Sequence, residues 1–354
     1  MAHTLQDRFA PLVDAKLRDT LVQRNGAVWN NRYEGDPKAG VVKIPVRDTE
    51  VTVAAYNKAS GKALTEGATS YLPVTIDKDY AVNEIIDGYD AAAVPDNLVA
   101  DRLDSAGYSL GLQMNSDGTA VLVAGATPIS NAAALTDANV YAAFVTARTA
   151  LSNAKVPLAG RFALVTPECY ALILQSDEFI KASALGDAVV QTGALGQIAG
   201  FNIFEDATLP DTSYFIVGHP NWCTRIEEWA VPVRLQSLEG SGTFIGASAV
   251  QGRKIYKHAV TKSSTLLIRP TMLDPVYTIT GGATDTAAIA STGSTSIKYR
   301  FYDASDPSPD WGAWAEYATP ITVAEGDKIE AYGEHTDGTK TITVAHTVTA
   351  DDVA

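Results

Sequence analysis

The segment from residue 50 to residue 80 limits what this chain can fold into more than any other part of the sequence. It is rich in Thr, Val, Ala, Tyr and Gly, and two of its runs, VTVAAYN and YLPVTID, alternate as the two strands of a long hairpin do. Neither run has a dense apolar face, and a hairpin of this kind is unstable alone in water. The sequence therefore predicts a hairpin that needs another surface to lie on, with the polar stretch KASGKALTEGATS at its tip.

The chain is long enough for two domains and apolar enough for a sizeable core. It has 354 residues, of which 46% are apolar and 19% charged, and domains of roughly 100–200 residues are the norm. The net charge of −14 argues against a dedicated nucleic-acid binder, because neutralising phosphates needs clustered Lys and Arg. A container whose inner face meets DNA only locally is compatible with this charge.

The last part of the chain differs from the rest in charge and texture. Residues 271–354 hold 4 basic and 13 acidic side chains, a balance of −9, which leaves −5 for the first 270 residues. Pro275, Gly281 and Gly282 predict a linker or a first turn. The runs SIKYRFYD, ITVAEGD, KIEAYGEH and KTITVAHTV follow, separated by turn residues. Short strands at this spacing predict a small β-sandwich as a second domain over 271–354.

Helices and strands alternate irregularly in the first 270 residues. The strongest helix signal begins at Pro95, with Asp96 as N-cap, and its apolar positions recur every three or four residues. Those positions are Val99, Leu103, Ala106, Leu110 and Met114. Further helices are predicted over 4–25, 136–153 and 167–180. Strands are predicted over 41–46, 162–165, 201–204, 214–217, 229–235, 243–250 and 265–268. This mixture is typical of an α+β fold rather than a doubly wound sheet.

The order of these parts resembles the Hong Kong 97-like major capsid fold of tailed bacteriophages. The resemblance covers residues 1–270 and implies an N-arm over 1–40, an extended hairpin loop over 50–80, a spine helix over 95–125, peripheral and axial domains, and an axial-type α+β domain over 130–250. The phrases RFALVTPECYALIL, IAGFNIFEDATLP and FIVGHPNWCTRIEEW also carry it. The phrase IKYRFYDASDPSPDWGAWAEY is similar to immunoglobulin-like or chitobiase-C-terminal-like sandwiches appended to phage structural proteins.

The resemblance implies a structural protein and not an enzyme. It implies a coat protein that self-assembles into an icosahedral shell around a double-stranded DNA genome, with no cofactor. The implied partners are copies of itself in pentamers and hexamers, a portal protein and DNA bound without sequence specificity. A separate scaffolding protein is also expected, because the sequence has no long N-terminal extension that could act as a built-in scaffold. The location expected is the virion, after assembly in the host bacterial cytoplasm. The start MAHTLQDRF lacks the blocks of a signal peptide, and no run is apolar over the ~18 residues of a membrane helix, so no membrane partner is expected.

Two other functions fit parts of the sequence. An encapsulin-type cargo compartment would share the shell fold, but the appended acidic sandwich argues against it. A glycan-binding or adhesive surface protein could be built on the C-terminal sandwich, but the absence of a signal peptide argues against that. Packaged DNA or packaged protein would distinguish the first two functions.

Neither a catalytic site nor a metal site is predicted. The sequence has no H-E-x-x-H and no Walker glycine loop. Its one G-x-S-x-G run, residues 107–111, lies inside the predicted helix that starts at Pro95 and not at a strand-to-helix turn, so no nucleophile elbow is predicted. Cys169 and Cys223 each stand in an apolar context that predicts a buried free thiol. His219, next to a proline, is a turn residue rather than a catalytic base.

The acidic residues of one loop are a candidate ion site. Asp303, Asp306 and Asp310 crowd a Pro-containing loop, and calcium takes several oxygen ligands, but their spacing matches no known calcium loop. Solvated loop residues are the preferred interpretation.

Five residues are candidates for contacts with other molecules. Lys58, Lys62 and Glu66 lie at the predicted hairpin tip and are candidate inter-subunit contacts. Some members of the resembled family crosslink through a lysine placed there, and the alternatives are salt bridges to a neighbour or plain solvation. Trp311 and Trp314 are candidate surface aromatics that could stack on sugars or a host surface, and the alternative is burial in the sandwich core. The −9 balance predicts that the C-terminal domain projects from the outer surface of the shell, away from DNA.

Overall fold

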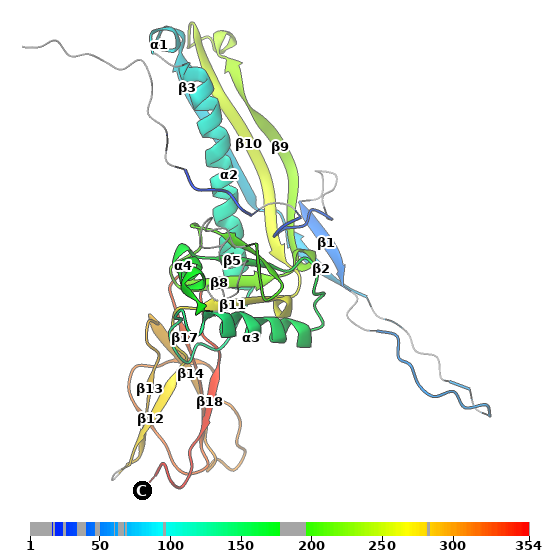
Figure 1. Cartoon of the computed structure of the whole chain (residues 1–354), viewed down its shortest axis with the longest axis vertical. Helices are drawn as coiled ribbons and strands as arrows, with labels where there is room; N and C mark the ends of the chain where they lie inside the picture. The colour runs from blue at the N-terminus through cyan, green and yellow to red at the C-terminus, as the bar shows by residue number, and fades with distance from the viewer. Residues whose placement is uncertain are drawn as a thin grey trace, which may run out of the picture. The chain divides into compact units, whose positions relative to one another are not determined.

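The computed structural model describes residues 16, 18–23, 26–33, 40–46, 50–59, 61–62, 67, 69–94, 97–177, 196–281 and 284–353. Its internal contacts divide the chain into two compact units. Unit 1 comprises Met1–Leu17, Asn31–Met114 and Thr224–Thr261, and unit 2 comprises Arg18–Asn30, Asn115–Cys223 and Lys262–Ala354. The fold is α+β, as predicted (Figure 1).

The helices are α1 (Gly88–Ala93), α2 (Leu98–Gly125), α3 (Val140–Asn153) and α4 (Pro167–Gln175). The strands wholly or mostly in unit 1 are β1 (Val41–Val46), β2 (Ser70–Thr75), β3 (Lys78–Asp87), β9 (Cys223–Ser237) and β10 (Ala247–Val260). The first strands of unit 2 are β4 (Thr127–Pro128), β5 (Phe162–Val165), β6 (Gln197–Ile198), β7 (Phe201–Glu205), β8 (Ser213–Gly218) and β11 (Leu266–Pro270). Its last strands are β12 (Val276–Thr280), β13 (Thr286–Ala290), β14 (Ser296–Tyr302), β15 (Ala315–Glu316), β16 (Ile321–Thr322), β17 (Lys328–Glu334) and β18 (Val344–Thr347). No helix in the described part of the chain is long and apolar enough to cross a membrane.

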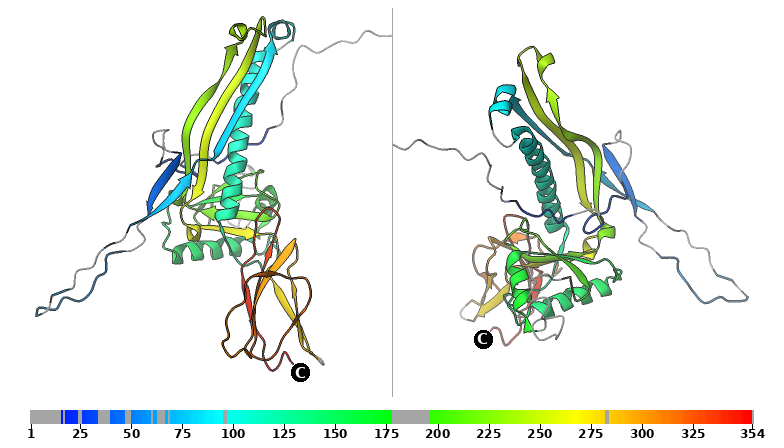
Figure 2. Two further views of the ribbon diagram at one scale, coloured as in Figure 1. Left: turned by 180° about the vertical axis from the view of Figure 1, so that it is seen from behind. Right: turned by 45° about the horizontal axis from the view of Figure 1, so that its top comes forward.

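The hairpin predicted over 50–80 is wrong in its pairing. β2 pairs antiparallel with β1, from Val41 opposite Thr75 to Val46 opposite Ser70, and not with residues 51–57. The reason is burial: Ile44 of β1 and Val74 of β2 pack together against Ile226, so that this register buries apolar surface. The described residues between β1 and β2 form no strand, and Figure 2 shows them extending beyond the two strands.

Strands β3, β10 and β9 form a three-stranded sheet in unit 1. The predicted strands over 229–235 and 243–250 are too short, and residues 243–246 lie in an irregular segment before β10. The predicted hairpin segment ran on to residue 80, whereas strand β2 ends at Thr75 and β3, from Lys78, pairs with β10 instead. Charged residues within β9 and β10 interrupt the alternation of apolar residues from which a strand is predicted. One of them, Lys257 in β10, lies 2.6 Å from Asp77 and lowers the pKa of that carboxyl.

Helix α2 matches the predicted spine helix. Asn97 has a left-handed backbone (φ 51°), and its side chain accepts a 3.5 Å hydrogen bond from the Ala100 amide at the helix start. The proposed cap Asp96 and Pro95 lie outside the described residues. In unit 1 the predicted stripe packs through Ala106 against Ile86 and Val250. The amphipathic pattern therefore identified the buried face correctly.

The six-stranded sheet of unit 2 has the order β4-β11-β8-β5-β7-β6, with α3 and α4 packed on it. Phe144 of α3 stacks on Phe215 of β8, with ring centroids 4.4 Å apart. The helix α3 begins at Val140 instead of 136, because the Asn139 side chain accepts a hydrogen bond from the Thr136 amide and closes a separate turn. The helix α4 begins at the predicted proline but ends at Gln175 rather than 180, and residues 178–195 lie outside the described part.

The described residues 276–281 and 284–353 form two sheets, β12-β13-β16 and β15-β14-β17-β18. Their facing side chains build a common core around Ile289, Ile329 and Val348. Of the two predicted alternatives, a linker or a first turn, the second fits: β12 starts directly after Pro275, and Gly281 lies between the paired strands β12 and β13. The assignment to an immunoglobulin-like class stays a prediction.

A buried asparagine fixes the chain where it leaves β11. The Asn131 side chain is fully buried and donates hydrogen bonds to the backbone carbonyls of Pro270 (2.9 Å), Thr271 (3.2 Å) and Met272 (2.8 Å). The carboxylate of Asp274 in turn accepts a 2.7 Å bond from the backbone N–H of Asn131. We call this group of contacts the junction clamp. It makes residues 270–274 an ordered part of unit 2.

The predicted N-terminal helix falls mostly outside the described residues, and residues 18–23 have no helical structure. Gln23 is buried and donates to the hydroxyl of Thr119 (2.6 Å) and the carboxylate of Asp206 (2.9 Å). Trp29, also buried, donates to the Gln23 side-chain oxygen at 3.2 Å. This polar network anchors Gln23 and Trp29 in unit 2.

The two cysteines are buried free thiols, as predicted. Burial raises the pKa of Cys169 and of Cys223 to about 12. Because the thiolate is the reactive form, we expect neither to react with iodoacetamide at about pH 8 in the folded protein, while both react in urea. As the pH rises, the thiols of the unfolded chain lose their protons before those of the folded protein. The contribution of the two buried thiols to the free energy of unfolding is therefore fully present below about pH 8.5 and declines as the pH rises toward 12. Mass spectrometry of alkylated protein tests this, and rapid native labelling would contradict it.

Candidate interaction surfaces

The loop between β1 and β2 presents apolar side chains to solvent. Val51 is 85% exposed, Val53 92% and Tyr56 74%. Large apolar side chains gathered in one exposed segment mark a contact site with another molecule, because leaving them in water is unfavourable. We call the described residues 50–62 the exposed loop.

The tip of the exposed loop is a tight turn. Asn57 and Gly61 form an isolated bridge, and the Asn57 side chain accepts a 2.8 Å bond from the Ala59 amide. Lys58 lies exposed in this turn, and the Lys62 ammonium donates to the backbone carbonyl of Thr52. Glu66 lies outside the described residues. The structure therefore places both predicted lysines at a loop tip, with Lys62 also bracing the loop.

A second surface lies on the four-stranded sheet of the C-terminal region. Ile297, Tyr299 and Phe301 of β14 face the core, so the alternate residues face outward. Outward-facing Arg300 has its guanidinium 4.7 Å from the Trp311 ring centroid and 5.0 Å from that of Trp314. Distances under about 6 Å allow cation–π attraction. Trp314 is 41% exposed and neither tryptophan belongs to the core cluster, so the sequence alternative of core burial is wrong.

The contacts around Arg300 continue on both sides. The guanidinium is held by Glu330, with Nε 2.6 Å from the carboxylate. Four further pairs extend the row: Tyr302 with Trp311 (5.6 Å), Lys328 with Tyr302 (5.1 Å), Trp314 with Tyr332 (4.9 Å) and Lys340 with Tyr332 (5.2 Å). We call these side chains the aromatic–cation stack. Sequence reasoning found its two tryptophans but missed the arginine between them, because Arg300 lies in β14, more than ten residues before Trp311.

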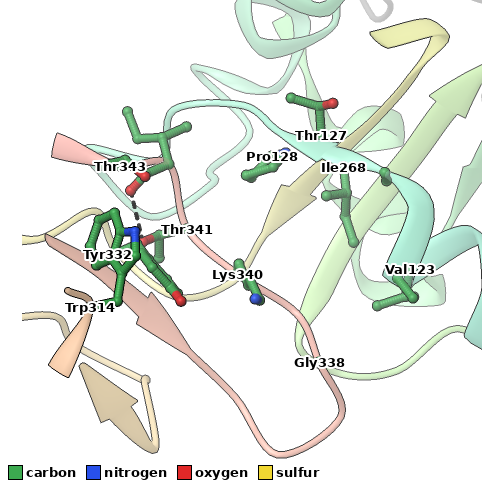
Figure 3. Close-up of a pocket in the computed structure, with 13 residues that line it drawn as sticks. Val123, Thr127, Pro128, Ile268, Trp314, Tyr332, Gly338, Lys340, Thr341 and Thr343 are labelled. Carbon is green, nitrogen blue, oxygen red and sulfur yellow. Dashed lines mark hydrogen bonds between the residues drawn. The ribbon is translucent and has the colours of Figure 1, made fainter. Parts of the chain in front are cut away.

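One end of the aromatic–cation stack borders a cavity of about 540 Å³ within unit 2. Figure 3 shows Trp314 and Tyr332 on one side and Val123, Thr127, Pro128 and Ile268 on the other. Lys340 lies between the two sides, and its ammonium is 3.2 Å from Glu334. Trp311 does not line the cavity. Cavities of about 300–1,000 Å³ with aromatic walls and a few polar groups are the usual form of small-molecule sites.

The remaining sequence candidates have structural roles. His219 caps a short 3-10 turn, accepting a 3.1 Å bond from the Asn221 amide, as predicted for a turn residue. Asp303 and Asp306 accept bonds from the amides two residues ahead, and Asp310 from the next amide, so the three carboxylates shape their own loop. Within the described residues, no group of three or more His, Cys, Asp or Glu side chains could hold a metal ion.

Comparisons with known proteins give one consistent result. A family model described as phage capsid protein matches residues 84–262, which is just over half of the chain. A structure from Mycobacterium phage Che8 has a TM-score of 0.64 at 19% identity, covering 75% of this chain and 97% of that one. The capsid of cyanophage P-SCSP1u has a TM-score of 0.61 and the mature capsid of bacteriophage PhiM1 one of 0.59, both at 14% identity and both covering 75% of this chain and 92% of theirs. Curated proteins give no match.

Proposed function

Since this chain belongs to the phage capsid protein family and is a structural major capsid protein of a tailed phage, we propose that its copies close as pentamers and hexamers into an icosahedral shell around double-stranded DNA. The family match over 84–262 carries this proposal. The family match does not favour the two alternatives, an encapsulin-type compartment and an adhesive surface protein. Repeated contacts that close by rotation are what build such rings.

The exposed loop is proposed as the arm that reaches a neighbouring copy. Val51, Val53 and Tyr56 are exposed within the subunit, and a neighbour's surface would remove them from water. Lys58, Lys62 and Glu66 would add charged contacts, each contributing about 0–1 kcal/mol at an exposed position. The repetition of the contact over the shell multiplies this small term.

The partners beyond the shell itself follow from the same proposal. A separate scaffolding protein guides assembly in the host cytoplasm, and a portal protein replaces part of the shell. The inner face meets packaged DNA without sequence specificity, in keeping with a net charge of −14 that leaves only local basic contacts.

The assembly proposal is tested by producing the full chain with its scaffolding protein and examining it by sedimentation and negative-stain microscopy. Closed shells or capsomer rings are the expected result. A strictly monomeric species at high protein concentration, with the scaffold present, would contradict the proposal.

Residues 271–354 are proposed to form an immunoglobulin-like domain displayed on the outer surface. Their balance of −9 supports this, because packaged DNA repels an acidic domain at close range. On intact DNA-filled particles we expect protease and antibodies to reach residues 280–350. Protection of this segment on intact particles, with cleavage after disruption, would place the domain inside.

Removing the C-terminal domain tests whether shells form without it. The contacts of the junction clamp determine the residue after which the chain should end. Stopping the chain after Pro275 keeps Asp274 and the carbonyls that Asn131 binds, whereas stopping after Pro270 removes most of them. We expect shells of normal diameter from the longer truncation, thinner by one surface feature, and a less stable subunit from the shorter one. Microscopy gives the diameter and thermal unfolding the stability. Loss of shells with the longer truncation would show that the domain takes part in subunit contacts.

A further inference from the structure

We propose that the cavity beside the aromatic–cation stack is a binding site for a neutral saccharide. Its position in unit 2 is set by two sets of contacts: the junction clamp, and the Thr212 hydroxyl, which lies 3.0 Å from that of Thr339. The walls therefore belong to one folded unit and do not need a ligand to bring them together.

The aromatic side of the cavity can receive the apolar face of a sugar ring. Trp314 is 41% exposed, and it is held in place by Arg300 at 5.0 Å and by Tyr332 at 4.9 Å. A side chain that is already fixed loses little conformational entropy when a ligand binds, so more of the contact energy remains for affinity. The stack thus presents a rigid aromatic surface.

The polar groups around the cavity match hydroxyl groups better than charges. Thr127 and Thr343 line it and are exposed. The Thr127 hydroxyl donates a 3.1 Å bond to the Ser263 carbonyl, so it can serve a ligand as an acceptor. The Lys340 ammonium has three donor hydrogens and is neutralised by Glu334 at 3.2 Å. A cavity whose single cation is already paired has no surplus charge for an anion.

Other ligand classes fit less well. The balance of −9 over residues 271–354 disfavours nucleic acid, since binding phosphates needs uncompensated basic side chains. An aromatic peptide side chain would use the Trp314 surface but would make no hydrogen bond with the hydroxyls or the ammonium that line the cavity. A saccharide can contact both sides of the cavity, because its apolar ring face can pack on Trp314 and its hydroxyls can hydrogen-bond with the polar groups.

Saturation-transfer NMR on the full-length protein tests the site with named probes. The neutral probes are the methyl glycosides of glucose, galactose and N-acetylglucosamine and their β-linked disaccharides, and sialyllactose serves as the acidic comparison. We expect at least one neutral probe to bind with millimolar or better affinity and to bind more tightly than sialyllactose. The measurement can be made on unassembled subunits, so a failure to form shells would not affect the result for saccharide binding.

Three substitutions locate the binding. Trp314→Ala removes the aromatic surface, and Ala124→Trp fills the cavity from an exposed position at the end of α2 without removing any contact of Trp314. Each should weaken binding by about tenfold or more. Trp311→Ala is the matched control, because Trp311 belongs to the same stack but does not line the cavity, and binding should stay within about threefold.

Three results would overturn the proposal. The first is absence of binding by every neutral probe. The second is equal loss with Trp311→Ala and Trp314→Ala while Ala124→Trp binds normally, which would place binding on the sheet face outside the cavity. The third is tighter binding of N-acetyltryptophanamide than of any saccharide, which would make the cavity a peptide site.

Discussion

A subunit whose exposed loop is replaced should fold but should not form shells. Val46 and Ser70 are the last pair in the register of β1 and β2, so a short Gly-Ser link in place of residues 47–69 can close the hairpin without changing that register. The buried residues Ile44 and Val74 keep their contacts with Ile226. What is lost is the segment whose apolar side chains face solvent, each of which contributes about 1.5–3 kcal/mol when fully buried.

Sedimentation and circular dichroism measure the two parts of this expectation. The loop variant should sediment as a small species with the spectrum of the full chain. A length-preserving variant, with Val51, Val53 and Tyr56 all changed to Ser, should assemble poorly for the same reason, whereas Lys58→Ala should assemble nearly normally because an exposed charge contributes little. Outright unfolding of the loop variant, or normal shells from it, would show that the loop is not an assembly element.

Replacing Asn131 by aspartate should destabilise the fold strongly. The side-chain amide now donates to three carbonyls, and a carboxylate of the same size would accept nothing from them and would face Asp274. Leaving a buried charge without a partner costs about 3–5 kcal/mol. We expect the free energy of unfolding in urea to fall by about that amount, and Asn131→Ala to have a smaller effect.

The sign of a pH effect provides an independent check on the clamp. Burial beside another carboxylate raises the pKa of the new aspartate. The loss in the free energy of unfolding caused by Asn131→Asp should therefore be largest at neutral pH, and it should become smaller as the pH falls and the new carboxyl group becomes neutral. Asn83→Asp is the control, because Asn83 is exposed and its side-chain oxygen already acts as an acceptor for Gln251. The explanation would be contradicted if Asn83→Asp changed the free energy of unfolding by more than about 0.5 kcal/mol, or if Asn131→Asp did not change it.

The parts of the fold that the sequence predicted are those with local causes. The strand Phe162–Val165 has a buried side chain at every position, and the helix after it begins with Thr166 as cap and Pro167 in its first turn. The spine helix repeats its apolar residues at helical spacing over many turns. In each case the signal lies within a few residues of the element itself.

The errors have non-local causes. Alternation marks residues 51–57 and 71–77 equally well as strands, and only burial against Ile226, some 150 residues away, selects β1 as the partner of β2. The same holds for the candidate binding site. Trp311 and Trp314 stand out in the sequence, but Arg300 between them, and Val123 and Ile268 across the cavity, are brought there by the fold.

The junction clamp binds the chain by its backbone, and this has a consequence for how such a protein can change. Asn131 contacts the carbonyl oxygens of residues 270–272, which every amino acid possesses, so its hydrogen bonds do not depend on the side chains at those positions. Asn131 and Asp274 alone supply the side chains of the clamp that determine where the chain is held. The same attachment point could therefore carry a different C-terminal module, or a longer one, and the shell-forming part of the chain could exchange its appended domain during evolution without rebuilding the site where that domain begins.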